Sequence, residues 1–317
     1  MGAGASVHRP VLLAETIEAL APRDGGRYID ANLGGGGHAE AILERSAPGG
    51  RLLGIDADAG AIAGARDRLA RFGDRLQTFH GSSARLAEAA DRAGFSSVDG
   101  VLFDLGISSD QLVDRERGFG IRAGGRLDLR FDVTRGEPAS SVIAALGARE
   151  LAGIFRQFGD EPHAMRIARA IVAQRVAAPI DTAELLAALV ERSVPAGRPT
   201  RIHPATRVFQ ALRIYVNDEL QALEVALVAA IDRLAAGGRV AVLTYHSLED
   251  RIVKRAFATA VRGCICPPKL PTCACGIAPT LRLVTKRAIL PGEAELHDNP
   301  RSRSAKLRAA ERLAVAA

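Results

Sequence analysis

The chain has 317 residues, of which 48% are hydrophobic and 25% charged, proportions that are typical of a globular protein and exclude an intrinsically disordered one. Lysine and arginine number 42 against 36 aspartates and glutamates, a modest excess that suits a polyanionic partner without requiring one. The length fits one large α/β domain or a core that carries an insertion.

The first third of the chain alternates between helical and strand patterns. The patterns predict helices at 11–20, 38–46, 59–71 and 84–93, and strands at 27–33, 51–56, 76–81 and 98–104. Strands and helices that alternate in this way predict a parallel sheet with helices on both faces.

The pattern changes after Asp104. Residues 138–192 read as successive helices with no strand between them, which predicts a helical insertion. Apolar residues recur every three or four positions from Thr206 to Leu234, so we predict one long amphipathic helix there. The elements expected after it are a strand at 239–246, a helix at 247–257 and a late strand at 281–290, while periodicity does not decide between helix and strand for 304–315. We therefore expect a core at 1–110 and 204–317, ending in a basic segment, with an insertion at 111–203.

Four consecutive glycines, Gly34 to Gly37, join the first strand to its helix. Such a loop lets a ligand approach the backbone, and Asp56, about 20 residues further on, ends the second strand where a ribose would be held. This spacing fits either NAD or S-adenosylmethionine. Asp30 just before the loop and the run GGGGH favour S-adenosylmethionine, because an acidic residue repels a pyrophosphate and attracts a sulfonium. A purely structural turn is the alternative.

Asp104 ends the strand VLFD, at the edge where open α/β sheets place their reacting groups. A carboxylate there could accept hydrogen bonds from an exocyclic amine and orient its lone pair toward a methyl donor. The alternative is a helix start in which Ser108 or Ser109 is the N-cap.

The segment TYHSLEDR contains His246, Glu249 and Asp250, which together suggest a catalytic cluster or a metal site. Ser247 and Asp250 have the spacing of a capping box, and no second histidine stands at metal-ligand spacing. We assign this segment a structural role and leave open whether His246 lines the cleft.

All four cysteines, Cys264, Cys266, Cys273 and Cys275, lie in one proline-containing segment. They could chelate a tetrahedral metal or be thiols in a turn. The common zinc signature is Cys-x-x-Cys rather than Cys-x-Cys, so we assign no metal ligand and no catalytic role.

Basic residues gather in three places and fit phosphate contacts on a folded RNA, although a solvated surface is the simpler reading of any one of them. The three groups are Arg115, Arg117, Arg122, Arg126, Arg130 and Arg135; Arg201 and Arg207; and Arg301, Arg303, Lys306 and Arg308.

Ordered motifs from His8 to about Arg312 resemble those of the RsmH (MraW) family, bacterial 16S ribosomal RNA cytosine-N4 methyltransferases. The motifs are HRPVLLAETIEAL, YIDANLGGGGHAEAIL, DGVLFDLGISSDQLVDRERGF, LDLRFD, HPATRVFQALRIYVNDEL, TYHSLEDRIVKR and NPRSRSAKLRAAER. The resemblance implies a Rossmann-like S-adenosylmethionine-dependent methyltransferase core with an inserted helical substrate-binding domain, acting on a cytosine in the decoding region of the small ribosomal subunit RNA.

The resemblance also implies site residues. It places the methionine part of the cofactor at Gly36, Gly37 and His38 and the ribose at Asp56, and it adds Ser83, Asp104 and Gln111 to the cofactor site. This chain has Ala31-Asn32 where the family usually has Gly-Thr, and Ser83 where it has an aromatic residue. The expected mechanism is direct in-line transfer to an unstacked cytosine whose N4 amine is oriented at Asp104, without a covalent enzyme intermediate.

Two other functions compete with this interpretation. One is a nicotinamide-dependent oxidoreductase that uses the same loop, and the other is a catalytically inert RNA-binding or ribosome-assembly factor with the same fold. The expected partner is 16S rRNA in the small subunit, with a homodimer left open. No secretory signal and no apolar run of the roughly 20 residues that cross a bilayer is found, so we expect a cytoplasmic protein without membrane contact.

Overall fold

The computed structural model describes residues 10–121, 125–195, 203–264, 266–267, 272 and 274–314. The chain forms two compact units, which are described separately. The sheet unit consists of Met1–Gly106 and Leu220–Ala317, and the helical unit consists of Ile107–Glu219.

The sheet unit is built on a seven-stranded sheet with the order β3-β2-β1-β4-β5-β7-β6. Strands β1 to β5 run parallel, whereas β7 pairs antiparallel with both β5 and β6. The strand bounds are β1 Arg27–Asp30, β2 Arg51–Asp56, β3 Leu76–His80, β4 Val98–Asp104, β5 Leu234–Thr244, β6 Leu281–Leu283 and β7 Lys306–Arg312. The chain moves outward from β1 to β3 and then returns to add β4 on the other side of β1, so the strand order reverses between β1 and β4.

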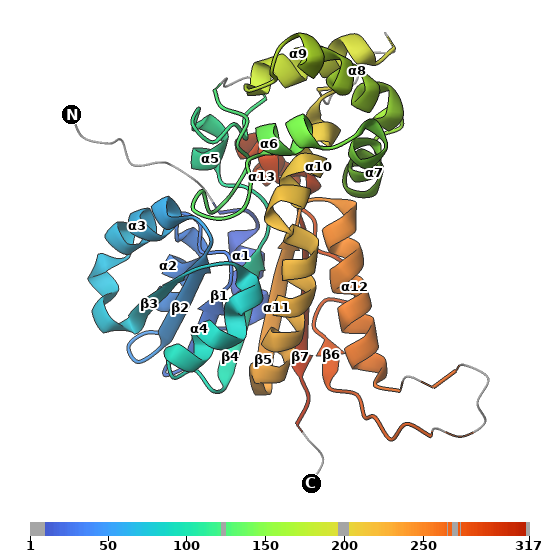
Figure 1. Ribbon diagram of the computed structural model, residues 1–317. Coiled ribbons are helices and arrows are strands. Elements are labelled where there is room, and N and C mark those ends of the chain that lie inside the picture. Colours follow the sequence, from blue (N-terminus) through green and yellow to red (C-terminus); the bar gives the residue numbers. More distant parts are fainter. Residues whose placement is uncertain are drawn as a thin grey trace. The chain divides into compact units, whose positions relative to one another are not determined.

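Helices cover both faces of this sheet (Figure 1). Their bounds are α1 Leu13–Leu20, α2 Gly37–Arg45, α3 Ala59–Arg68, α4 Leu86–Arg92, α11 Glu219–Arg233, α12 Ser247–Arg262 and α13 Glu293–Asp298, with short 3-10 turns η1 Ala70–Arg75, η2 Ser83–Arg85 and η3 Pro300–Ser304.

The two faces of the sheet belong to two different apolar cores. Val101 and Phe103 of β4 share a core with α4, α11 and α12, while Leu102 between them shares the other core with α1, α2 and α3. Side chains alternate along a strand, so a strand that is covered on both faces reads as a continuous apolar run such as VLF. The predicted α/β fold is confirmed.

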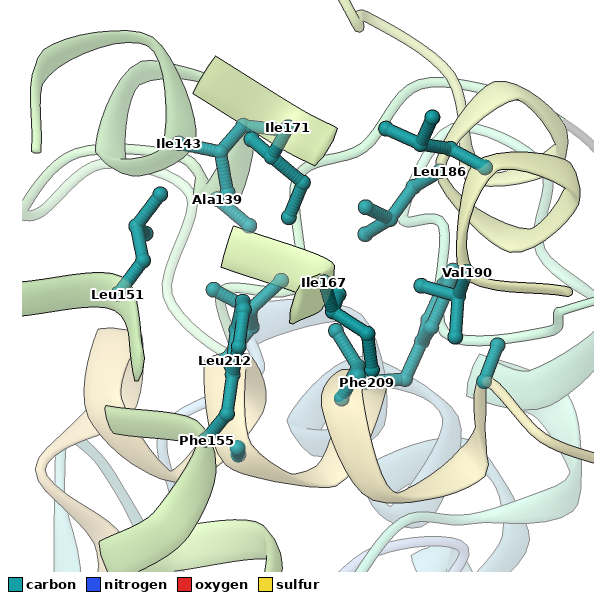
Figure 2. Close-up of a cluster of buried hydrophobic side chains, with 14 of the residues drawn as sticks. Ala139, Ile143, Leu151, Phe155, Ile167, Ile171, Leu186, Val190, Phe209 and Leu212 are labelled. Atoms are coloured by element: carbon teal, nitrogen blue, oxygen red, sulfur yellow. The ribbon is translucent and has the colours of Figure 1, made fainter. Parts of the chain in front are cut away.

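The helical unit contains α5 Ser109–Val113, α6 Ala139–Ala145, α7 Ala148–Gly159, α8 Ala164–Ala177, α9 Ala183–Ser193 and α10 Thr206–Asn217. Its core is drawn in Figure 2, where Ile143, Phe155, Ile167, Leu186 and Leu212 from successive helices point toward one another. Two helix starts are capped locally: Glu150 accepts a hydrogen bond from the Gly147 amide at 2.8 Å before α7, and the Thr182 hydroxyl accepts one from the Leu185 amide at 3.3 Å before α9.

The prediction of one long helix from Thr206 to Leu234 is wrong. Asp218 has left-handed backbone angles (φ 49°, ψ 35°) and ends α10, and α11 begins at Glu219. The Asn217 side chain also binds the backbone of the loop before α6. It accepts a hydrogen bond from the Phe131 amide and donates one to the Leu129 carbonyl, each at 2.7 Å. The apolar face of α10 packs in the core of the helical unit, and that of α11 packs in a core of the sheet unit. The three-and-four spacing continues through the break, so the sequence pattern does not reveal it.

One late strand is shorter than predicted, and the structure decides a segment that periodicity left open. The late strand expected at 281–290 is only the three-residue β6, and the undecided C-terminal segment forms β7. Among the described helices, none is long and apolar enough to cross a membrane.

Candidate active site at the carboxyl edge of the sheet

Three neighbouring parallel strands end in aspartate at the same edge of the sheet. Asp30 ends β1, Asp56 ends β2 and Asp104 ends β4. The strand order reverses between β1 and β4, and open α/β sheets bind their ligands at the carboxyl edge beside such a reversal. The strand pattern alone predicted this grouping of Asp56 and Asp104.

The glycine loop after β1 is held against the end of β2. The Gly34 amide donates to Asp56 Oδ2 at 2.8 Å, and Gly34 and Gly36 both have positive φ angles (49° and 77°). A Cβ atom on Gly37, the first residue of α2, would lie 2.4 Å from the ring of Pro10. A larger residue there would therefore push the start of α2 away from the segment that precedes α1. The run of glycines therefore serves the local packing as well as leaving the backbone accessible to a ligand.

Asp56 is positioned by two backbone amides. Its Oδ2 accepts from Gly34 and its Oδ1 accepts from Asp58, both at 2.8 Å. Burial raises the pKa of Asp56 to about 6, although both amide hydrogen bonds lower it. Each carboxylate oxygen has a further lone pair, so the side chain can accept hydrogen bonds from two ribose hydroxyls.

The carboxylate of Asp104 is held at both oxygens. Tyr245, just after β5, donates its hydroxyl to Oδ1 at 2.8 Å, and His38 Nδ1 of α2 lies 3.2 Å from Oδ2. His38 Nε2 lies 3.1 Å from the Val11 carbonyl oxygen, which can only accept, so Nε2 carries a proton. This arrangement fixes the direction in which Asp104 points.

The charges around Asp104 are coupled. Burial of His38 lowers its pKa, but the hydrogen bond and the charge of Asp104 outweigh burial and leave the pKa raised, which favours the cationic form of the ring. Burial also raises the pKa of Asp30 to about 7, although His38 acts in the opposite direction. A group with several carboxylates and one histidine attracts a cationic ligand more than a pyrophosphate.

The segment after β5 corrects one prediction. The capping residue of α12 is His246, not Ser247: its Nδ1 accepts the Glu249 amide at 3.4 Å, and the Glu249 carboxylate accepts the His246 amide at 3.2 Å. Strand β5 ends at Thr244, two residues earlier than predicted, while α12 begins at Ser247 as expected. Asp250 instead pairs with Arg308 Nε at 2.6 Å and Lys306 Nζ at 3.5 Å.

Two expected cofactor residues have local structural roles. Ser83 begins η2, the turn that follows β3, and the residue that caps this turn is Ser82, whose hydroxyl accepts the Ala84 amide at 3.3 Å. Gln111 belongs to the helical unit and forms a reciprocal capping box with Ser108, at 3.0 and 3.2 Å. The alternative of a helix start after Asp104 is thus realised at Ser108, while the cofactor roles of Ser83 and Gln111 stay predictions.

Sequence reasoning missed two groups of this site. Tyr245 is one, although its place directly after a strand that returns to the sheet was a usable signal. The other is the side-chain oxygen of Asn32, which is buried between β1 and the glycine loop and has no hydrogen-bond partner in the described part of the chain. An unpaired buried acceptor is costly, so it marks a place where a ligand donor would fit.

The arginines expected at phosphates divide into two groups. Arg117 donates to the backbone of residues 130 and 131 at 2.9 and 2.8 Å, Arg130 pairs with Asp128 at 2.7 Å, and Arg308 pairs with Asp250. These three stabilise the fold. The members that are exposed are Arg115, Arg126, Arg135, Arg207, Arg301 and Arg303, while Arg122 and Arg201 lie outside the described residues.

The fold and the acidic strand ends are those of a doubly wound α/β enzyme of the S-adenosylmethionine-dependent methyltransferase type. A model of the MraW methylase family matches residues 5–313. The chain belongs to the MraW methylase family.

Two relatives of similar length support this assignment. Ribosomal RNA small subunit methyltransferase H of Thermomicrobium roseum is 55% identical over 309 residues, covering 98% of this chain and 94% of that protein. The protein of the same name from Trichlorobacter lovleyi is 50% identical, with 96% and 98% covered. A solved rRNA methylase from Streptococcus thermophilus is 12% identical and has a TM-score of 0.42, with 98% and 100% covered. The predictions of family, of a methyltransferase and of S-adenosylmethionine as cofactor are confirmed.

Proposed function

We propose that this protein transfers the methyl group of S-adenosylmethionine to the N4 amine of a cytosine in the decoding region of 16S rRNA. The observation that carries the proposal is the Asp104 carboxylate, fixed at both oxygens by His38 and Tyr245 beside the glycine loop. The name of the relatives described above supports a substrate in the small subunit RNA.

The residues at the sheet edge fit the proposed cofactor. Asp56 would accept the two ribose hydroxyls, and the partnerless oxygen of Asn32 and the buried Asp30 would face the ammonium and sulfonium charges. The bound cofactor supplies an electrophilic methyl group. The same carboxylates would repel a dinucleotide pyrophosphate, which counts against a nicotinamide-dependent oxidoreductase.

Asp104 acts on the amine of the substrate. The lone pair of an exocyclic amine is delocalised into the base, so the amine is a weak nucleophile and gains from exact orientation toward the methyl group. The Asp104 carboxylate accepts an N–H of this amine, directs the nitrogen along the line of attack and takes the proton that the nitrogen loses when the new bond forms. No covalent intermediate is required, and all four cysteines lie between 264 and 275, outside this group of residues.

The helical unit, Ile107–Glu219, is the proposed RNA-binding part, and its bounds are similar to those of the insertion predicted at 111–203. Its exposed Arg115, Arg135 and Arg207 are suited to phosphate contacts, which would make binding fall with rising salt. We place the protein in the cytoplasm with the small ribosomal subunit as its partner. Pairing into a homodimer stays a prediction.

The test uses small subunits that lack the modification, labelled S-adenosylmethionine and mass spectrometry of the nucleosides. We expect N4-methylcytidine with the natural protein and none with Asp104→Asn. The matched control is Asp99→Asn, since Asp99 lies on the same strand β4 and pairs with Arg23 instead. Cofactor binding and RNA binding without any transfer would favour the inert assembly factor, and failure to bind the cofactor would refute the methyltransferase proposal.

A further inference from the structure

We propose that the segment between α12 and β6 is a zinc site in which Cys264, Cys266 and Cys275 supply thiolate ligands. This site is separate from the methyl-transfer residues, and its role is to hold the segment in one conformation.

The three sulfur atoms converge. They all lie within 4.8 Å of one another, and the Sγ atoms of Cys264 and Cys275 are 3.8 Å apart. Zn–S bonds of about 2.3 Å in a tetrahedron place neighbouring sulfurs about 3.8 Å apart. A disulfide would need about 2.05 Å, so the spacing is that of ligands around one ion.

The base of the segment is fixed by the fold. Gly263 ends α12 with a φ of 68°, and a Cβ atom there would lie 2.4 Å from the nitrogen of Pro279, so the two ends of the segment are in contact. The Thr280 amide donates to the Ala260 carbonyl at 2.8 Å, and Leu281 of β6 is buried. The ends therefore meet at a rigid position, from which the cysteines extend.

The segment has no apolar core among its described residues. The cysteines Cys264, Cys266 and Cys275 are half-buried, whereas the other described residues from Cys264 to Pro279 are exposed: Pro267, Thr272, Ala274, Gly276, Ile277, Ala278 and Pro279. A short stretch that buries only its sulfur atoms lacks the hydrophobic area that could order it, and a structural metal supplies that energy in small folds.

One sulfur also has an outer partner of the kind that metal sites use. The Ala274 amide donates to Cys266 Sγ at 3.3 Å. A backbone amide that points at a sulfur stabilises the thiolate over the thiol and orients it as a ligand. Each cysteine that binds zinc releases its proton to solvent, and no electron transfer is involved.

Zinc is the metal that best suits sulfur ligands in a tetrahedral arrangement without redox chemistry. The three cysteines leave the fourth position of the tetrahedron to a water molecule. The Cys-x-Cys spacing argued against a metal in the sequence, because spacing does not show that Cys275 meets Cys264 and Cys266 across a closed loop.

The experiment measures zinc in the full-length protein, purified under reducing conditions without chelator. We expect about one zinc ion per chain by mass spectrometry of the metal. Cobalt added to the metal-free protein should give the sulfur-to-metal charge-transfer and strong visible bands of a tetrahedral thiolate site.

Variants assign the ligands. Cys266→Ser and Cys275→Ser should each lower zinc affinity by at least about 10-fold to 100-fold. That is the effect of removing a group that only hydrogen-bonds to a ligand, and the loss of a ligand itself should be no smaller. Thr272→Ser is the matched control, because Thr272 is exposed in the same segment, and it should keep the full zinc content. Melting curves and cofactor binding of each variant show that the sheet unit remains folded.

Two results would overturn the proposal. One is reduced protein that takes up no zinc and whose cysteines react with a thiol reagent at the same rate with and without the metal. The other is a Cys264–Cys275 disulfide found by mass spectrometry in protein kept under the same reducing conditions.

Discussion

The hydroxyl group of Tyr245 is the most informative atom to remove from this protein. Burial, followed by the nearby charge of Asp104, raises the pKa of Tyr245 well above its ordinary value, so the hydroxyl keeps its proton and donates to Asp104 Oδ1 at 2.8 Å. Tyr245→Phe deletes this donor and keeps the ring, which packs against Gly106. The variant therefore tests whether the orientation of Asp104 matters for the reaction.

The size of the effect follows from the kind of hydrogen bond. A bond to a charged group contributes about 1.5 to 3 kcal/mol. If that energy serves to orient Asp104 in the transition state, kcat falls about 10-fold to 100-fold. Transfer is not abolished, because His38 still holds the other carboxylate oxygen. The affinity for S-adenosylmethionine should stay within about twofold, since this substitution leaves Asp56 and the glycine loop unchanged.

The assay measures initial rates on small subunits at saturating cofactor, together with cofactor binding and thermal unfolding. Tyr28→Phe is the matched control: Tyr28 is a buried tyrosine of β1 whose hydroxyl accepts the Arg23 amide at 2.8 Å. It should lower stability by a similar amount and leave kcat unchanged. If Tyr245→Phe destabilises the protein as the control does and still turns over within twofold of the natural rate, the hydrogen bond is only structural and the reasoning fails.

Three further predictions concern the cofactor and the two units. Asp56→Asn should weaken cofactor binding, and in the natural protein affinity should decline as pH falls through about 6, because the protonated carboxyl no longer accepts both ribose hydroxyls; calorimetry between pH 5 and 8 that shows a constant affinity would contradict this. Asp250→Ala leaves Arg308 and Lys306 without their carboxylate and should lower the free energy of unfolding by about 1 to 3 kcal/mol at neutral pH. This is less than for a fully buried ion pair, because both cations are partly exposed. The arginine and lysine lower the pKa of Asp250, so its contribution exists above the ordinary value near 4 and is lost as pH falls below it; urea unfolding at two pH values should show the gap between variant and natural protein shrink in acid. Phe155→Ala should destabilise the helical unit by about 3 to 5 kcal/mol, seen as faster hydrogen exchange in α7 and α10, and equal exchange in both proteins would refute the assigned core.

Much of the candidate site could be read from the sequence because it is encoded by short-range patterns. Gly34 follows β1 within a few residues, while Asp56 and Asp104 end β2 and β4, and the carboxyl ends of parallel strands meet at one edge whatever the details of packing. Motifs spread along the whole chain carried the family assignment in the same way.

The partners of Asp104 could not be read in this way. Tyr245 is 141 residues away, and it reaches Asp104 only because β5 pairs with β4 in a register that places Leu243 opposite Asp104. The ring of His38 was expected at the cofactor, but its two nitrogens meet Asp104 and the Val11 carbonyl. A pattern specifies which residues are apolar or acidic, while a hydrogen bond depends on positions to within a few tenths of an ångström.

The helix break at Asp218 and the meeting of the cysteines have the same explanation. Apolar spacing of three and four residues predicts a helix face but does not show that this face serves two different cores. The distance between Cys264 and Cys275 depends on how the loop between them closes, and Gly263 and β6 determine that closure. The sequence by itself determined the alternation of strands and helices and the acidic ends of the strands, because these follow from local periodicity. Register, loop closure and the direction of each polar side chain were decided by the tertiary structure, because they arise only when distant segments pack together.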